Sequence, residues 1–194
     1  QYSMWAQCPH RWKTAYIDGH REFSDNIHTL FGTSMHEVIQ TFLTVMYNDT
    51  AKMAEALPLE DMLLTRMKRN FESVLETNGG EMFCTEKDMV EFYQHGVEIL
   101  KFIRKKRAQY FSKKGYELIG IEVPLNYDLP NNVKFVGYID IVIRDTVRDV
   151  IKIYDIKTST MGWNKWMKAD KNKTDQLLLY KQFYSKQFNH PMDK

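Results

Sequence analysis

The sequence has few of the residues and patterns on which several common kinds of functional site depend. It contains only two cysteines, Cys8 and Cys84, among 194 residues, which is too few for a four-thiolate zinc or iron–sulfur site. It has no glycine-rich phosphate loop, no nucleophile elbow and no internal repeat. No apolar run approaches the roughly 20 residues that a membrane-spanning helix needs, and no signal peptide opens the chain. We therefore expect no iron–sulfur cluster, no contact with a membrane, and a reducing compartment in which the thiols stay unpaired.

The charges of the chain are nearly balanced. The formal net charge is +2, so any affinity for a polyanion has to come from local clusters of basic residues. Hydrophobic residues make up 43% of the chain and charged residues 27%, a balance typical of a globular protein. The length favours a single domain over residues 1–194, with room for a substantial core.

Two aspartates occupy unexpected positions in a predicted β-hairpin. Residues 137–159 consist of two runs rich in Ile, Val and Tyr around a polar turn. A turn centred between residues 147 and 148 places Asp140 directly opposite Asp155, where like charges repel. Lys157 follows two residues later and would share their face of the sheet. Buried charges are costly unless they are paired or bound to a metal, so this arrangement requires a counter-ion.

The preceding hairpin adds a third carboxylate. A Pro-Asn-Asn turn at residues 130–132 separates two further strands, and a register centred on this turn places Glu122 opposite Asp140. Glu122, Asp140 and Asp155 then form one row across a three-stranded antiparallel meander. A divalent cation with oxygen ligands is the simplest partner for such a row. The alternative is a surface strand whose acids face water, but the apolar neighbours of Asp140 indicate burial of at least one face.

Helices are predicted on both sides of this meander. Apolar spacing and capping signals indicate helices over residues 3–17 with Ser3 as the cap, 30–48, 59–75, 89–111, and 174–188 with Thr174 as the cap. The Thr-Asn-Gly-Gly stretch at 77–80 separates the third helix from the fourth. Residues 48–114 therefore form a long helical region, in which no motif is recognisable.

Three further features are candidates for function, and each has an ordinary structural alternative. His36 lies on the second predicted helix, where a histidine is more often structural than a metal ligand. Gln176 and Tyr180 are four residues apart and so project from one face of the last helix. The segment 163–173 combines two tryptophans with four lysines. Such a segment suits stacking on bases and contact with phosphates, but a solvated loop anchored by a buried tryptophan is equally consistent with it.

Taken together, these motifs resemble a known family. In chain order, the sequence is similar to the RecB-like branch of the PD-(D/E)XK nucleases at Gly32-Thr33-x-x-His36, Glu122, Gly137-Tyr138-Ile139-Asp140, Asp155-Ile156-Lys157-Thr158 and Gln176-x-x-x-Tyr180. The first predicted helix also resembles the amino-terminal helix of that branch, including Ser3 and the Cys8-Pro9 pair. The resemblance extends from Ser3 to Tyr180 and leaves residues 48–114 as a helical insertion.

The resemblance implies an α/β fold with a PD-(D/E)XK, restriction-endonuclease-like core: a three-stranded antiparallel meander flanked by helices. The family core also ends with a strand after the Gln-Tyr helix, and the last residues of this sequence are too short to form it. We therefore expect a chain truncated at its C-terminus, with that strand supplied by a further C-terminal segment or by a partner protein. The proline of the family's name is replaced by Tyr138-Ile139 before Asp140, and the C-terminal cysteines of the iron–sulfur members are absent.

The resemblance also implies a set of metal ligands and a catalytic lysine. His36, Asp140 and Asp155 would bind Mg²⁺ or Mn²⁺, together with the main-chain carbonyl of Ile156. Lys157 would hold the attacking water and stabilise the negative charge that develops in the transition state.

The remaining candidate residues concern the substrate. Gln176 and Tyr180 would position the lysine and the nucleic-acid backbone, and Glu122 matches an acidic position that the family uses less uniformly. The candidates for contact with nucleic acid are Arg11, Lys13, Trp163, Lys165, Trp166 and Lys168.

The implied function is metal-dependent hydrolysis of phosphodiester bonds in single-stranded DNA or at duplex ends. We expect an exonuclease of replication, repair or recombination, located in the cytoplasm of a bacterial or phage-infected cell or in another reducing compartment that handles DNA. One alternative is a structure-specific or restriction-type endonuclease. Another is a catalytically silent nucleic-acid-binding domain, but silent relatives usually lose the aspartates or the lysine, and all three are present here.

Overall fold

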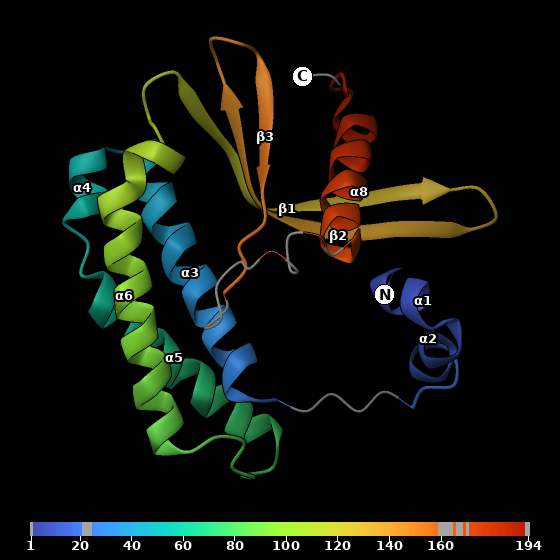
Figure 1. The fold of residues 1–194 in the computed structure, drawn as a ribbon, viewed down its shortest axis with the longest axis horizontal. Coiled ribbons are helices and arrows are strands. Elements are labelled where there is room, and N and C mark those ends of the chain that lie inside the picture. The colour runs from blue at the N-terminus through green and yellow to red at the C-terminus, as the bar shows by residue number, and fades with distance from the viewer. Residues whose placement is uncertain (1, 21–24, 159–164, 166–168, 170, 193–194) are drawn as a thin grey trace.

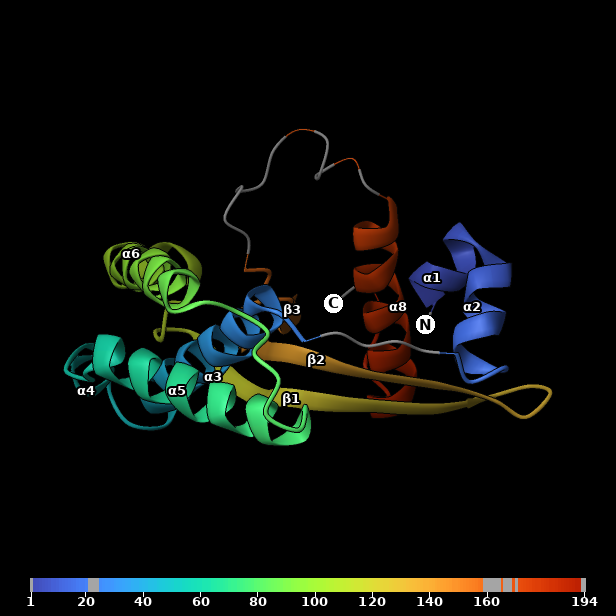
Figure 2. The same ribbon diagram turned by 90° about the horizontal axis from the view of Figure 1, so that it is seen from below.

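The computed structural model describes residues 2–20, 25–158, 165, 169 and 171–192. Figure 1 shows a group of long helices packed together on one side and, on the other, a long β-ribbon with the last helix against it. In chain order the elements are α1 (Tyr2–Gln7), α2 (Pro9–Tyr16), α3 (Ile27–Asn48), α4 (Ala51–Glu55), α5 (Leu59–Thr77), α6 (Glu86–Tyr110), β1 (Tyr116–Leu129), β2 (Val133–Asp145), β3 (Val150–Tyr154) and α8 (Lys171–Phe188). The predicted class is confirmed: the fold is mixed α/β, with a three-stranded antiparallel sheet and flanking helices (Figure 2).

The sheet has the strand order and the registers that the two turns predict. The order is β1-β2-β3, and both neighbouring pairs are antiparallel. In the first hairpin, Leu129 pairs with Val133 across the Pro-Asn-Asn turn, and the same register continues to Gly120 and Val142. Asn131 and Asn132 have positive φ angles of 62° and 58°, which asparagine tolerates better than most residues. In the second hairpin Asp145 pairs with Val150.

The ladders are interrupted where the acids lie. Val123 pairs with Ile139 and Ile121 with Ile141, so Glu122 faces Asp140, but no ladder pair joins these two acids. Glu122 has a φ of 49°, a left-handed conformation that is unfavourable for a residue with a side chain. The β1–β2 ribbon changes direction sharply near its middle in Figure 1. We attribute the interruption to this bend.

Asp155 also lies outside the regular sheet. The β2–β3 ladder ends with Ile141 opposite Tyr154, and Asp155 is the next residue along the chain. The predicted cross-strand pair of Asp140 and Asp155 would be the following step of that ladder. Instead the main-chain N–H of Ile156 donates to Asp140 Oδ2 at 2.6 Å. After β3 ends, the chain is therefore held to β2 by a hydrogen bond to the Asp140 side chain and not by another ladder pair.

Two hydrophobic clusters meet on β2. The larger one joins the buried face of α3 to α5, α6 and the side chains of Ile141 and Ile143. The smaller one joins Leu125, Ile139 and Val142 to Phe183 and Tyr184 of α8. Full burial of a side chain of this size contributes about 1.5–3 kcal/mol. The α4–α6 region, predicted as an insertion, thus supplies much of the main core.

The N-terminal stretch forms two helices where the sequence predicted one. Helix α1 begins at Tyr2, so Ser3 lies in its first turn and is not its cap. Cys8 interrupts the stretch with an extended backbone, and its Sγ accepts a hydrogen bond from the N–H of Arg11. Pro9 follows at the first position of α2, where its missing N–H costs nothing. The break is therefore explained by the Cys8-Pro9 pair.

The helix boundaries also differ from the prediction at other places. Asn26 and Thr29 form a reciprocal capping box, so α3 begins at Ile27, three residues earlier than predicted. A second capping box of Thr85 and Asp88 starts α6 at Glu86. Helix α8 begins at Lys171, so Thr174 lies inside it and is not its cap. The short helix α4 was not predicted, because five residues are too few to show a periodic pattern.

Candidate metal centre

His36 reaches the sheet from the middle of α3. The helix turns its apolar side chains into the core, with Met35, Val38 and Ile39 buried, which leaves His36 half-buried at the edge of that face. Its Nε2 atom lies 2.8 Å from the carbonyl oxygen of Ile156. A carbonyl oxygen only accepts, so Nε2 carries the hydrogen and donates it. In the neutral ring the other nitrogen, Nδ1, then has a free lone pair.

The free nitrogen faces the acid on the central strand. His36 Nδ1 lies 3.8 Å from Asp140 Oδ2. An imidazole that binds a metal through one nitrogen commonly donates its other N–H to a main-chain carbonyl, which fixes the ring orientation. The contact with Ile156 therefore suits a metal-binding histidine. The carbonyl oxygen of Ile156 keeps a second lone pair, so its own predicted role as a ligand stays a prediction.

Asp140 is nearly buried, with 9% of its surface exposed. Burial raises the pKa of its carboxyl group, because the charged form loses its hydration. The hydrogen bond from Ile156 N–H and the nearby His36 act in the opposite direction, while Asp155 and Glu122 raise the pKa further. The net result is a carboxyl group with a raised pKa, whose charged form is poorly stabilised by the protein alone.

Glu122 supplies a second carboxylate from the adjoining strand. Ligand atoms of His36, Glu122 and Asp140 all lie within 4.8 Å of one another. Gln40, one helical turn after His36, donates through Nε2 to Glu122 Oε1 at 2.6 Å. The structure therefore brings together one nitrogen and two carboxylates from three separate elements, α3, β1 and β2.

Asp155 is paired with Lys157 in this structure. Lys157 Nζ lies 2.9 Å from Asp155 Oδ2 and 3.0 Å from Oδ1. The Asp155 side chain is 11% exposed and that of Lys157 is 40% exposed, so the ammonium group opens toward solvent. Asp155 does not belong to the group formed by His36, Glu122 and Asp140. Its charge is still close enough to raise the pKa of Asp140.

Two glycines of the sequence motifs lie where other chain segments approach closely. A β-carbon on Gly32 of α3 would lie 3.3 Å from Thr158 Oγ1, in the segment that follows β3. A β-carbon on Gly137 would lie 3.0 Å from Tyr180 Cε1. The first glycine lets α3 approach the segment that carries Lys157, and the second lets α8 approach β2 three residues before Asp140.

Gln176 and Tyr180 contact each other on α8. Gln176 Nε2 donates to the Tyr180 hydroxyl at 2.9 Å, as their i,i+4 spacing allows. Among the described residues, neither makes a hydrogen bond to His36, Glu122 or Asp140. The close approach of Tyr180 to Gly137 places the pair near β2. Their predicted role in positioning the lysine stays a prediction.

The donor set fits a divalent cation. Carboxylate and carbonyl oxygens suit Mg²⁺ and Mn²⁺, and one imidazole nitrogen shifts the preference toward Mn²⁺. A bound cation would also offset the negative charges of Glu122 and Asp155, which raise the pKa of Asp140. His36, Glu122 and Asp140 are therefore the residues of this chain best placed to hold such an ion.

The predicted nucleic-acid contacts lie in two regions. Arg11 and Lys13 are both exposed on α2, and Lys13 forms an ion pair with Asp18 at 3.1 Å. Lys165 is exposed as well. Trp163, Trp166 and Lys168 lie outside the described residues. Sequence reasoning missed Gln40, although its spacing of four residues from His36 places both side chains on the same face of a helix.

One buried and one exposed carboxylate on neighbouring strands, together with a histidine on a helix, form the kind of site found in metal-dependent hydrolases. The comparisons with known proteins agree with this class. The family model for the PD-(D/E)XK nuclease superfamily matches residues 1–194, so the chain belongs to that superfamily. Searches of curated proteins and of solved structures gave no significant match.

Membership of this superfamily implies a metal-dependent nuclease that acts on nucleic acid. The residues that could hold a metal in this fold are those already described at the junction of α3, β1 and β2. In the described part of the chain, no helix is both long and apolar enough to cross a membrane.

Proposed function

We propose that the protein is a Mg²⁺- or Mn²⁺-dependent deoxyribonuclease of the RecB-like branch, acting as an exonuclease in replication, repair or recombination. The observation that carries this proposal is the convergence of His36, Glu122 and Asp140 within 4.8 Å of one another, beside the ion pair of Lys157 and Asp155. The order of the motifs along the chain supports the assignment to the branch, and DNA is the substrate that the resemblance implies.

A divalent cation bound here would supply positive charge and lower the pKa of a bound water, which a phosphodiester anion requires for attack. The residues of the chain have separate tasks. Asp140 and Glu122 would provide the negative charge that holds the ion, and His36 would add a nitrogen ligand whose ring is oriented by its hydrogen bond to Ile156. Asp155, which was predicted as a ligand together with His36, Asp140 and the Ile156 carbonyl, acts on the pKa of Asp140 and pairs with the lysine.

Lys157 is the proposed catalytic cation of the chain itself. Its ammonium group is partly exposed and pairs with Asp155, whose charge acts on Asp140. A fixed positive charge in this position stabilises the extra negative charge of the pentavalent transition state more than that of the substrate. Gln176 and Tyr180 bond to each other, and Tyr180 lies close to Gly137 on the strand that carries Asp140. From this position they would orient the lysine and the nucleic-acid backbone.

The preference for DNA ends rests on the resemblance. Helices α5 and α6 share a core with α3 and are part of the body of the fold. The competing function is a structure-specific or restriction-type endonuclease with the same metal centre. A catalytically silent nucleic-acid-binding domain is disfavoured, because a domain of that kind has no need for Lys157 beside intact acids.

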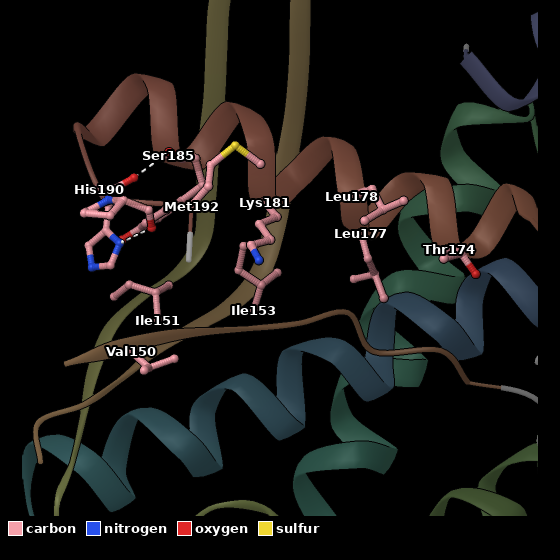
Figure 3. A pocket seen from close by; sticks show the side chains of 12 residues that line it. Val150, Ile151, Ile153, Thr174, Leu177, Leu178, Lys181, Ser185, His190 and Met192 are labelled. Carbon is pink, nitrogen blue, oxygen red and sulfur yellow. Dashed lines mark hydrogen bonds between the residues drawn. The ribbon is translucent and has the colours of Figure 1, made fainter. Parts of the chain in front are cut away.

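A partner at the sheet edge is a further part of the proposal. Among the described residues β3 pairs only with β2, which leaves its other edge open. A cavity of about 340 Å³ lies between β3 and α8, lined by Ile151, Ile153, Leu177 and Leu178 among others (Figure 3). These features support a strand added to this edge by a partner protein.

Cleavage assays test the proposal directly. The protein is incubated with end-labelled linear DNA and with covalently closed circular DNA, in Mg²⁺, in Mn²⁺ and in EDTA. We expect the linear DNA to be degraded with either cation and the circles to survive. Linearisation of the circles would favour the endonuclease. Absence of cleavage on both substrates with both cations, together with retained DNA binding, would favour the silent domain.

A further inference from the structure

Gln40 lies next to the metal centre and is not part of any motif named above. It is the residue one turn after His36 on α3, so both side chains leave the helix on the same side. Its Nε2 atom donates a hydrogen bond of 2.6 Å to Oε1 of Glu122. A carboxylate can only accept, so the amide nitrogen must be the atom that faces it.

Glu122 needs an external support to stay in place. Its backbone is left-handed, with a φ of 49°, and no ladder pair with Asp140 fixes it at the bend of the ribbon. Its side chain is exposed to solvent, so packing does not restrict its rotamers either. The hydrogen bond from Gln40 is the contact that ties this carboxylate to α3, and hence to His36 on the same helix.

The chemistry of the amide suits this task. A lysine or arginine at the same position would hold Glu122 equally well, but its positive charge would repel a divalent cation bound to the same carboxylate. The neutral amide engages one oxygen of Glu122 and leaves the other oxygen and the full negative charge of the carboxylate available. This is the usual arrangement for the outer partner of a metal-binding carboxylate.

We propose that Gln40 is a positioning residue of the metal centre, which acts by holding Glu122 in reach of the cation bound by His36 and Asp140. The inference rests on the proposed function, because it requires a divalent cation at this site. It adds to that function a residue that touches neither the substrate nor the ion. Removal of an outer partner of this kind typically weakens metal binding by about 10- to 100-fold.

The test is a Mn²⁺ titration by calorimetry on wild type, Gln40→Met, Glu122→Ala and the double variant. Methionine has a similar size but no N–H donor, so Gln40→Met should fold as wild type while its affinity for Mn²⁺ falls about tenfold or more. In the Glu122→Ala background the same substitution should have no further effect, because the residue through which it acts is gone. Thr44→Val is the matched control, since among the described residues its hydroxyl bonds only to the Gln40 carbonyl of its own helix.

Three outcomes distinguish a wrong role for Gln40 from a wrong assignment of the metal centre. If Gln40→Met binds Mn²⁺ as tightly as wild type while Glu122→Ala binds it weakly, the metal centre stands and Gln40 has no part in it. If Gln40→Met weakens binding equally with and without Glu122, the residue does not act through Glu122 and the proposal is wrong. If wild type itself binds no Mn²⁺, the proposed function fails, and the inference fails with it.

Discussion

The main-chain N–H of Ile156 donates a 2.6 Å hydrogen bond to Oδ2 of Asp140, across the point where the β2–β3 ladder ends. The same residue accepts a hydrogen bond from His36 through its carbonyl oxygen. Ile156 therefore links the histidine of α3 to the aspartate of β2 through one peptide segment. The lysine that follows it in sequence pairs with Asp155.

Because the pKa of Asp140 is raised, its charged form should lower the stability of the fold, although this charge is needed to bind a metal. A carboxyl group whose pKa is higher in the folded state favours folding while it is protonated, and this contribution is lost as the pH rises through the folded-state pKa. Asp140→Asn removes the ionisation but keeps an oxygen that can accept from Ile156. Without metal at neutral pH, the variant should melt a few degrees higher than wild type.

The difference in melting temperature should shrink as the pH falls and close below about pH 4, where the aspartate is protonated in both states. Thermal melts of both proteins in EDTA between about pH 3 and pH 8 provide the measurement. Asp128→Asn is a suitable control, because Asp128 is an exposed acid near the hairpin turn. A variant that is less stable than wild type at neutral pH would contradict the assignment of the burial cost to Asp140.

Lys157 should matter for the rate of cleavage and little for metal binding. Lys157→Ala removes a charge that acts on the transition state, so we expect cleavage to slow by about 100-fold or more while the affinity for Mn²⁺ stays near that of wild type. Single-turnover cleavage and calorimetry measure the two quantities separately. Lys134→Ala, which also removes an exposed lysine paired with an aspartate, should leave both unchanged. A fully active Lys157→Ala protein would remove the lysine from the mechanism.

Gly96 tests the packing of the helical region against α3. A β-carbon on this residue of α6 would lie 2.4 Å from Cδ2 of Leu63 and close to Phe31 and Met35, all of them buried. Gly96→Ala should therefore destabilise the protein by about 1–3 kcal/mol, although alanine favours the helix by about 1 kcal/mol. Denaturant unfolding measures the change.

The double variant supplies the control for this prediction. In a Leu63→Ala background the space beside Gly96 is open, so the same Gly96→Ala substitution should be neutral or stabilising. Equal destabilisation in both backgrounds would mean that α5 and α6 do not meet as the structure shows.

The lysines of the segment 163–173 should contribute to DNA binding. The segment connects the strand end that carries Asp155 and Lys157 to α8, so a DNA strand that enters the metal centre would pass close to it. Replacing Lys165, Lys168, Lys171 and Lys173 with alanine should weaken binding and make its dependence on salt shallower. The logarithmic slope should fall by up to about 0.7–0.9 for each phosphate that a lysine no longer neutralises.

Binding assays over a range of salt concentrations test this prediction. A control that removes the same number of charges elsewhere replaces four exposed lysines of α6 and the loop after it, Lys101, Lys105, Lys106 and Lys114. If the two quadruple variants lose affinity equally, the effect is one of net charge, and the segment is a connector only.

Much of the sheet could be predicted from its turns. The Pro-Asn-Asn turn and the polar turn around Val147 fix the two registers, and the structure has both of them. Two departures occur at the acids: Glu122 adopts a left-handed backbone and Asp155 lies past the end of β3. The β1–β2 register also shifts by one residue between Leu118 and Gly120. Neither departure at the acids has a local sequence signal, since each depends on contacts with α3 and β2 that only the folded chain brings together.

The partners of the site residues were harder to predict than the residues themselves. His36 and Asp140 lie together as the motifs suggest, but the hydrogen bond from Gln40 to Glu122 joins residues 82 positions apart. Asp155, a predicted ligand, pairs with Lys157 and does not belong to the group formed by His36, Glu122 and Asp140. Local capping also escaped the prediction at Ser3 and Thr174, because the helices begin before these residues.

The most direct test of the account is a Mn²⁺ titration of the wild type, Asp140→Ala and Asp155→Ala, with Asp128→Ala as the control. The central claim is that a divalent cation binds where His36, Glu122 and Asp140 converge. We predict one site of measurable affinity in wild type and in the control, a large loss in Asp140→Ala, and a clear loss in Asp155→Ala. Equal binding of Mn²⁺ by all four proteins would contradict the claim.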